Sequence, residues 1–414
     1  MEASNKPRLL ALILFLAIAM IVVLLSVEGQ KTTVEGEQVI AEADPGVSAT
    51  MTPETTAAAL KPAPTQVEQP AKIATVTSVP SPSPSPTLTV TPDQEEVDVV
   101  ETLPAREGSS ELIRYGVTGG LEHATSAFDD GLLFGSLLNW HVEVNPPERD
   151  IMFWQMVRTS EEGIRRTTWE EIEQAVQANP GSFWLVGNEP DVPWQDNVTP
   201  QRYAEIYHEV YTFIKSRDPS ANIVIGGVSQ PTPLRRAYLD LVLDAYLVAY
   251  DQPMPVDVWN VHAFTLREER GSWGVDIPPG MDESNGILYE IEDHDNLDIL
   301  EQNLVEFRAW MADRGYGDKP LVVSEYGILM PEDYGFPPET VDRFLTGTFE
   351  LFQTMANETG YLPDDGRLVQ WWFWYSVYDE GLYQTGNLYD WSNEQLTTLG
   401  QTWTKYVSGG IEID

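Results

Sequence analysis

Two glutamates in this sequence stand where apolar runs end. Glu189 follows "FWLVGN" and precedes Pro190, and Glu325 follows "LVVS". If both runs are strands that end at one rim, the two carboxyl groups can face each other. One carboxyl could then protonate a leaving oxygen while the other attacks the carbon, which is the chemistry of glycosidic-bond cleavage. Each glutamate alone is more simply interpreted as a loop or surface carboxylate, so this prediction depends on the pair.

The runs that would position these glutamates belong to a longer series of short apolar segments. Their length and apolar character predict strands at eight places: 112–118, 132–140, 151–158, 183–188, 222–229, 256–264, 320–327 and 368–377. Glu189 and Glu325 then end the fourth and seventh strands. We also expect Pro190 to restrict Glu189 to an extended backbone, because a proline disfavours the helical region for the residue before it.

Amphipathic stretches separate most of these runs. Apolar residues recur at helical spacing in 168–179, 199–218, 234–251, 297–315, 338–357 and 393–407, whereas helices after the first two strands are poorly marked. Eight strand-helix units predict an α/β fold, the (β/α)8 or TIM barrel, whose site gathers at the carboxyl ends of its strands. A doubly wound open sheet is the alternative, but no G-x-G-x-x-G follows the first strand.

At its strand ends the chain resembles the clan A glycoside hydrolases, which are retaining (β/α)8 enzymes. The resemblance rests on Asn188-Glu189-Pro190, on Glu325, on His262 after "VWNV", and on the aromatic "WWFW" at 371–374. It implies that Glu189 is the acid/base, that Glu325 is the nucleophile, and that Asn188 binds the sugar 2-hydroxyl.

Within the clan, two segments are most similar to family 128, whose known members cleave β-1,3-glucan. These segments are "LNWHVEVNPPERDIMFWQMVR" and "VGNEPD". Families 39 and 5 are neighbouring alternatives. One residue departs from the clan, because many members carry a tyrosine two residues after the strand-six histidine, where this chain has Phe264. Tyr326, or a tyrosine from elsewhere, could replace that hydroxyl.

Several other side chains could support such a site. His262 could orient or tune Glu325, although a buried core histidine is the simpler alternative. Trp372 and Trp374 share one strand face and could form a platform for a sugar ring. Trp371 and Phe373 would then face the helices, but alternation by itself does not decide between the two sets. Further candidates are Asn139, Trp140, His141 and Trp154, for which plain core packing is the alternative.

The first hundred residues differ in composition from the rest. Residues 9–27 are uncharged, apolar and preceded by Lys6 and Arg8, which predicts an N-terminal signal anchor or signal peptide in residues 1–29. Residues 30–108 are rich in Pro, Thr and Ser and predict a disordered stalk. The domain at 109–414 would then lie outside the cytoplasm, tethered to the cell membrane by a single span or secreted after cleavage.

Charge and cysteine content narrow the function classes. The net charge of −41 argues against nucleic-acid partners and favours neutral or cationic ligands. The absence of cysteine excludes disulfides, thiol nucleophiles and cysteine-ligated metals. The acidic segment 289–298 lacks the glycine-centred calcium-loop pattern. We therefore expect a monomer without metal or cofactor, whose partner is a β-linked polysaccharide or oligosaccharide.

Two other function classes compete with hydrolysis. A non-catalytic carbohydrate-binding or adhesion module could use the same barrel, and Phe264 keeps this alternative open. A metal-dependent deacetylase or an esterase is disfavoured, because the sequence lacks a convincing His/Asp cluster and a G-x-S-x-G elbow.

Overall fold

The computed structural model describes residues 111–409. The predicted anchor at 1–29 and stalk at 30–108 lie outside this range. Within 111–409, no helix combines the length and apolar character needed to cross a membrane. The anchor and the stalk therefore stay predictions, which fractionation of full-length and truncated chains can test.

Eight parallel strands form a nearly closed ring, and each coincides with one of the predicted runs, although β3 extends two residues beyond 158. They are β1 (Tyr115–Thr118), β2 (Ser136–Leu138), β3 (Met152–Ser160), β5 (Phe183–Asn188), β6 (Asn222–Gly227), β7 (Trp259–His262), β8 (Leu321–Tyr326) and β10 (Trp371–Trp374). Their order is β6-β5-β3-β2-β1-β10-β8-β7. Isolated parallel bridges from Val224 to Val258 and from Val228 to Val261 join β6 to β7. The predicted α/β barrel is confirmed.

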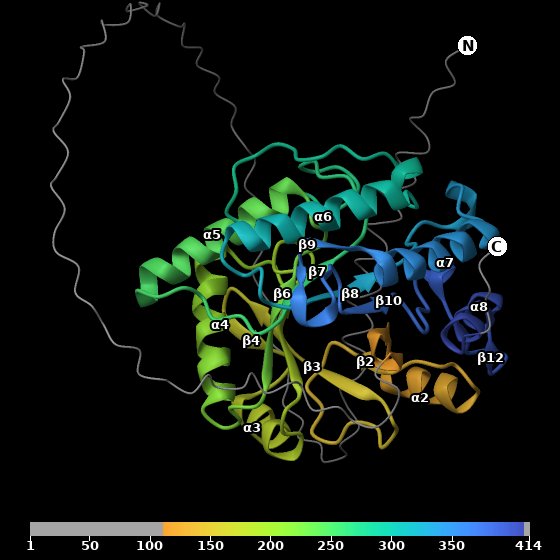
Figure 1. Ribbon diagram of the computed structural model, residues 1–414, viewed down its shortest axis with the longest axis horizontal. Coiled ribbons are helices and arrows are strands. Elements are labelled where there is room, and N and C mark those ends of the chain that lie inside the picture. Colours follow the sequence, from red (N-terminus) through yellow and green to blue (C-terminus); the bar gives the residue numbers. More distant parts are fainter. Residues whose placement is uncertain (1–110, 410–414) are drawn as a thin grey trace, which may run out of the picture. The chain divides into compact units, whose positions relative to one another are not determined.

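Helices surround these strands (Figure 1). They are α2 (Leu121–Asp129), α3 (Trp169–Ala178), α4 (Pro200–Lys215), α5 (Pro233–Tyr250), α6 (Leu297–Asp313), α7 (Pro338–Thr354) and α8 (Thr398–Val407). All six predicted helices are present, and α2 is the one that the sequence marked poorly. No helix follows β2, since residues 139–151 form an irregular loop.

Smaller elements occupy the connections. Four short strands and five 3-10 turns complete the described chain: β4 (Gly163–Arg165), β9 (Ala356–Tyr361), β11 (Tyr389–Asp390), β12 (Gln395–Leu396), η1 (Leu112–Arg114), η2 (Ile291–Asp293), η3 (Glu332–Tyr334), η4 (Leu362–Asp364) and η5 (Gln384–Gly386). The strand β4 pairs antiparallel with β3, and β11 pairs with β12. The predicted helix at 338–357 ends earlier, because Ala356 begins β9.

Local capping explains why several helices begin where they do. Thr168 and Glu171 form a reciprocal capping box at α3. Pro200 and Pro233 occupy the first turns of α4 and α5, where a missing N–H costs no hydrogen bond. The segments between strand and helix differ in length, and the longest of them joins β7 to α6 across residues 263–296.

Three groups of apolar side chains fill the fold. The largest lies between the ring and its helices, a small one around Val192 and Phe264 lies in the segments that follow β5 and β7, and another lies inside the ring. The inner group is Leu138, Trp154, Met156, Phe183, Leu185, Val224, Val258, Val322, Trp371 and Phe373. Trp154 is therefore a core residue, which was the simpler of its two interpretations.

The assignment of strand faces at 371–374 was wrong. Trp371 and Phe373 point into the barrel, whereas Trp372 and Trp374 pack in the layer between strands and helices. The Trp372 ring stacks on Phe352 at 5.4 Å between centroids, and both tryptophans are fully buried. Neither can offer a face to a sugar. The neighbouring strand supplies a physical reason. Gly116 lies opposite Phe373 in the register and leaves room for its ring, because a Cβ there would lie 2.4 Å from Phe373 Cδ1.

Candidate active site

A buried imidazole stands between the two predicted glutamates. Glu189 directly follows β5, Glu325 lies near the end of β8, and His262 is the last residue of β7. His262 Nδ1 is 3.0 Å from Glu189 Oε1, and His262 Nε2 is 3.8 Å from Glu325 Oε1. All three residues are buried. The structure therefore brings both carboxyl groups to the carboxyl end of the barrel, as the strand positions predicted.

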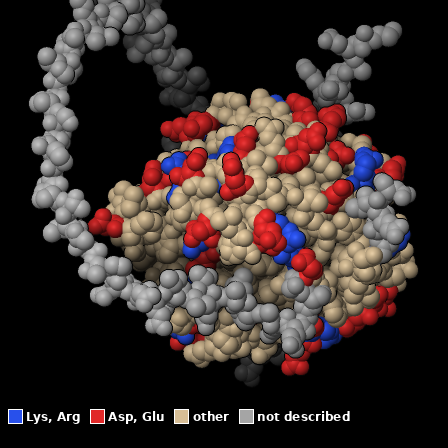
Figure 2. Space-filling model, in the orientation of Figure 1, with Lys and Arg blue, Asp and Glu red and all other residues tan. Residues whose placement is uncertain are grey.

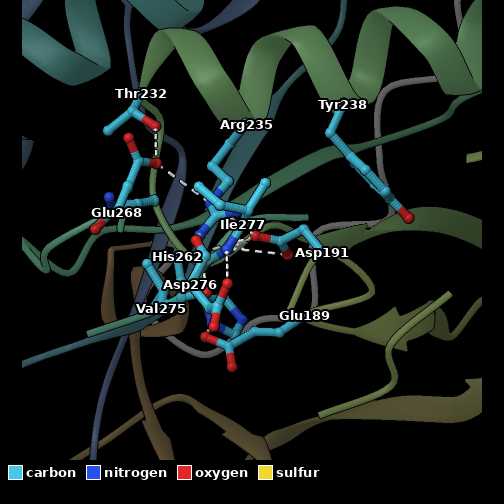
Figure 3. A network of polar contacts seen from close by, with 12 residues as sticks. Glu189, Asp191, Thr232, Arg235, Tyr238, His262, Glu268, Val275, Asp276 and Ile277 are labelled. Carbon is cyan, nitrogen blue, oxygen red and sulfur yellow. Dashed lines mark hydrogen bonds and ion pairs between the residues drawn. The ribbon is translucent and has the colours of Figure 1, made fainter. Parts of the chain in front are cut away.

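His262 was predicted to orient Glu325, and its shorter contact is to Glu189. Figure 3 shows its ring beside the Glu189 carboxyl group. The glycine at 227 makes room for this ring, because a Cβ there would lie 2.7 Å from His262 Nε2. A side chain at position 227 would therefore displace the imidazole from the two glutamates.

Glu189 does not have the extended backbone that Pro190 was expected to impose. Its φ is +44°, in the left-handed region, and its N–H donates to the carbonyl of Gly227 at 2.9 Å. This region is disfavoured for side chains other than glycine and asparagine, and strained residues of this kind gather at functional sites. Tertiary contacts override the local preference at this position.

Asp196 supplies much of that tertiary support. Its carboxylate pairs with Arg158 at 2.6 Å and with Arg165 at 2.7 Å, and it accepts the backbone N–H groups of Thr159 and Asn188 at 2.8 and 2.9 Å. Asp196 is buried, so these charge-assisted bonds are well shielded from water. The end of β5 is thus fixed to β3, and no feature of the sequence pattern pointed to Asp196.

A second buried network fixes the turn after Glu189 (Figure 3). Arg235 Nε lies 3.2 Å from Asp191 Oδ2 and 3.3 Å from Glu268 Oε1, and the guanidinium also donates to the carbonyls of Val275 and Asp276. Burial raises the pKa of Asp191, and the positive charge of Arg235 opposes that rise. Arg235 thus connects the turn after β5 to the long loop after β7.

Trp140 contacts the second glutamate, as a site residue should. It follows β2, has a positive φ of 61°, and its indole Nε1 donates to Glu325 Oε1 at 2.6 Å. The side chains of its two neighbours form hydrogen bonds within the loop after β2 instead. Asn139 Nδ2 donates to Glu143, and the His141 ring contacts the Asn139 carbonyl, so neither side chain hydrogen-bonds to Glu189 or Glu325. Their predicted role in substrate binding stays a prediction.

Two buried amides near the glutamates have unused hydrogen-bonding atoms. Among residues 111–409, Asn188 Oδ1 has no hydrogen-bond partner, and neither have Oδ1 and Nδ2 of Asn260. Asn260 lies on β7, two residues before His262, and was not singled out from the sequence. Buried polar atoms normally have partners, and Asn188, which directly precedes Glu189, carries the unpartnered oxygen nearest in sequence to the site. The predicted contact between Asn188 and a sugar hydroxyl remains a prediction.

The hydroxyl that Phe264 lacks does not come from Tyr326. Tyr326 is fully buried in the layer outside the ring, against Phe352 and Trp374. Tyr375, directly after β10, lies nearer the site, since its ring centroid is 5.9 Å from Trp140 and 6.4 Å from Phe264. Burial chiefly raises the pKa of Tyr375, and the charges of Asp379 and Glu325 add to the rise. Tyr375 was not among the residues predicted from the sequence.

The electrostatics of the site couple its three central groups. Burial raises the pKa of Glu325, and so does Glu189, while His262 and the Trp140 N–H lower it. Burial lowers the pKa of His262, but Glu325 and Glu189 together outweigh burial and raise it. Protons in such a cluster belong to the group of residues rather than to one of them. The arrangement can therefore hold a proton at one carboxyl while the other stays ionised.

The fold and site define an eight-stranded parallel α/β barrel, with a helix after every ring strand except β2 and a pair of glutamates at the carboxyl ends of the strands. In residues 111–409 no group of three or more His, Asp or Glu side chains could hold a metal ion. No protein-family model matches the chain, and no curated protein matches it.

Among solved structures, the chain is similar to β-1,3-glucanases of family GH128, the group that its strand-end motifs resemble. One is a subgroup II endo-β-1,3-glucanase from Sorangium cellulosum, at 16% identity and a TM-score of 0.46, covering 70% of this chain and 97% of that one. Another is a curdlan-specific exo-β-1,3-glucanase from Blastomyces gilchristii in complex with glucose, at 18% identity and a TM-score of 0.48, covering 70% and 97%. A third is a subgroup I endo-β-1,3-glucanase from Amycolatopsis mediterranei with laminarihexaose, at 13% identity and a TM-score of 0.48, covering 70% and 98%.

Proposed function

We propose that this protein is a retaining glycoside hydrolase that cleaves β-linked polysaccharides or oligosaccharides. The observation that carries the proposal is the Glu189–His262–Glu325 arrangement, with the imidazole 3.0 Å from one carboxyl group and 3.8 Å from the other. Most glycoside hydrolases cleave the glycosidic bond with a pair of carboxyl groups. Here such a pair is buried at the carboxyl ends of the barrel strands, where the active sites of these barrels lie.

In this mechanism Glu325 attacks the anomeric carbon and Glu189 gives its proton to the departing oxygen. Trp140 and His262 both face Oε1 of Glu325, which leaves Oε2 free to form the new bond. A water molecule then attacks the glycosyl-enzyme while Glu189 removes its proton, which restores the starting state of both carboxyl groups. Two displacements at one carbon give a product with the original anomeric configuration.

The charge of the protein supports an uncharged substrate. The chain carries 65 acidic and 24 basic residues, and acidic side chains are spread over the visible face with few basic ones between them (Figure 2). A polyanionic glycan would be repelled from such a surface, whereas a neutral glucan would not. A β-1,3-glucan is the first substrate to test because the strand-end motifs resemble family 128.

The stereochemistry of the product tests the mechanism. We expect proton NMR, recorded within minutes of mixing with β-1,3-glucan, xylan, mannan or galactan, to show the β-anomer as the first product from the substrate that is cleaved. Slow mutarotation to the α-anomer follows and serves as the internal control. A first product of inverted configuration would contradict the assignment of Glu325 as nucleophile.

The position of His262 leads to a prediction about pH. His262→Gln removes a positive charge that lowers the pKa of Glu325, while the larger effect of burial, which raises that pKa, remains. The pKa of Glu325 then rises further, so more of the nucleophile is protonated at a given pH. We expect the acidic limb of the kcat/KM profile to move to higher pH in His262→Gln. The control variant His208→Gln, in α4, should leave the limb in place. If the limb does not move in His262→Gln either, His262 does not keep Glu325 ionised.

A non-catalytic carbohydrate-binding module remains the second candidate. Phe264 favours it, because a buried phenyl ring stands where many clan members have a tyrosine hydroxyl, and Tyr375 hydrogen-bonds to Asp379 instead. Equilibrium binding of glucan without release of reducing ends over days would support this alternative over hydrolysis.

A further inference from the structure

One tryptophan near the proposed acid/base differs from all the others. The sequence has 13 tryptophans, all within the described residues, and Trp194 is the most exposed of them, with 50% of its surface accessible. A large aromatic ring gains free energy from burial, so an accessible indole beside a binding site is a candidate contact for a ligand.

Trp194 comes five residues after Glu189, and two consecutive turns lie in the segment between Glu189 and Gln195. The Val192 N–H donates to the Glu189 carbonyl at 3.1 Å, and the Gln195 N–H donates to the Val192 carbonyl at 3.0 Å. Val192, which belongs to both turns, is fully buried in an apolar cluster with Phe264 and Trp273. Tyr375 packs against this cluster. The turn that bears Trp194 is therefore anchored in an apolar cluster built from the segments that follow β5, β7 and β10 at the carboxyl end of the barrel.

The same turn is held rigidly on its inner side. Asp196, two residues after Trp194, binds Arg158 and Arg165, and these arginines also donate to the side chain and the carbonyl of Gln195. Further along, the Val198 N–H donates to the Pro190 carbonyl at 2.8 Å. A rigid turn presents the indole with little loss of backbone entropy on binding, which favours affinity.

We propose that Trp194 forms a platform for the sugar residues on the leaving-group side of the scissile bond. This inference rests on the proposed function. An acid that protonates the leaving oxygen lies on the side of the departing chain, and Trp194 belongs to the turn that begins at that acid. The occupant is a pyranose of the same neutral β-linked oligosaccharide, whose apolar face stacks on the indole.

Two substrates separate this role from a structural one. Laminarihexaose can place sugars on both sides of the cleaved bond, whereas the leaving group of β-laminaribiosyl fluoride is a single atom. We expect Trp194→Ala to lower kcat/KM on laminarihexaose about tenfold and to leave turnover of the fluoride within about twofold. Trp194→Tyr should keep most of the activity, because it retains a flat ring. Leu247→Ala, which removes an apolar side chain of 49% exposure on α5, is the matched control.

Binding provides a readout that does not need catalysis. In the Glu325→Gln background we expect Trp194→Ala to weaken laminarihexaose about tenfold by calorimetry, with Trp194→Tyr near the parent affinity. Equal losses on both substrates, or unchanged affinity and kcat/KM for laminarihexaose, would overturn the platform. If the wild type binds laminarihexaose but cleaves neither substrate, hydrolysis fails as the function, and the affinity of Trp194→Ala still decides the platform.

Discussion

Glu325→Ala is expected to lower kcat on the cleaved polysaccharide by at least about 10³-fold. The variant lacks the carboxylate that attacks the anomeric carbon, while Glu189, His262 and the barrel remain. Because the methyl group leaves space where Oε1 and Oε2 stood, azide should enter and partly restore turnover of an activated β-glycosyl fluoride. The product should be the α-glycosyl azide, which mass spectrometry and proton NMR identify.

The anomeric form of that azide product decides the role of Glu325. Azide attacking from the side of the missing carboxylate inverts the carbon once, whereas two displacements would return the β-azide. Glu332→Ala, which removes an exposed glutamate in η3 soon after β8, controls for a change of charge near the mouth. Full activity in Glu325→Ala would contradict the mechanism outright.

Glu189→Ala is expected to lose about 10²–10⁴-fold on the polysaccharide, because a sugar leaves poorly without a proton donor. Fluoride needs no such proton, so the first step should stay fast with a β-glycosyl fluoride. The second step should then become rate-limiting, since no base activates water. We expect a burst of fluoride release followed by slow turnover, with the glycosyl-enzyme visible as a mass increase on the intact protein.

Added azide should accelerate that slow step, because it needs no base, and should give the β-glycosyl azide. The two variants thus yield opposite azide anomers from one substrate. If Glu189→Ala also gave the α-product, or showed no burst, Glu189 and Glu325 would not have the roles assigned to them. Measuring both variants on one substrate makes each the control for the other.

The networks around Glu189 explain why the site tolerates a strained residue. Asp196 binds Arg158 and Arg165 beneath the strand end, and Arg235 binds Asp191 just beyond it. The left-handed backbone of Glu189 therefore lies between two buried ionic anchors. Ion pairs that are buried and well bonded cost much to break, so the conformation persists despite its local cost.

Much of the fold followed from local patterns in the sequence. Apolar runs of strand length alternate with stretches of helical spacing. Every predicted strand and helix was found, because each pattern depends only on residues that are close together in the sequence. The pairing of Glu189 with Glu325 also followed, since residues at the carboxyl ends of parallel barrel strands share one rim. The sequence by itself thus determined the barrel and the position of its two glutamates.

Tertiary structure decided what depends on residues distant in the chain. Alternation could not tell whether Trp371 or Trp372 faces the barrel interior, because both sets have period two and are aromatic. The residues of the neighbouring strands, such as Gly116 opposite Phe373, distinguish them. The hydrogen bond from Trp140 to Glu325 joins residues 185 positions apart, and the bond from His262 to Glu189 joins residues 73 apart. The left-handed backbone of Glu189, against the preference imposed by Pro190, likewise depends on Asp196 and Gly227. Local propensity specifies elements, and long-range contacts specify how their ends are bent and paired.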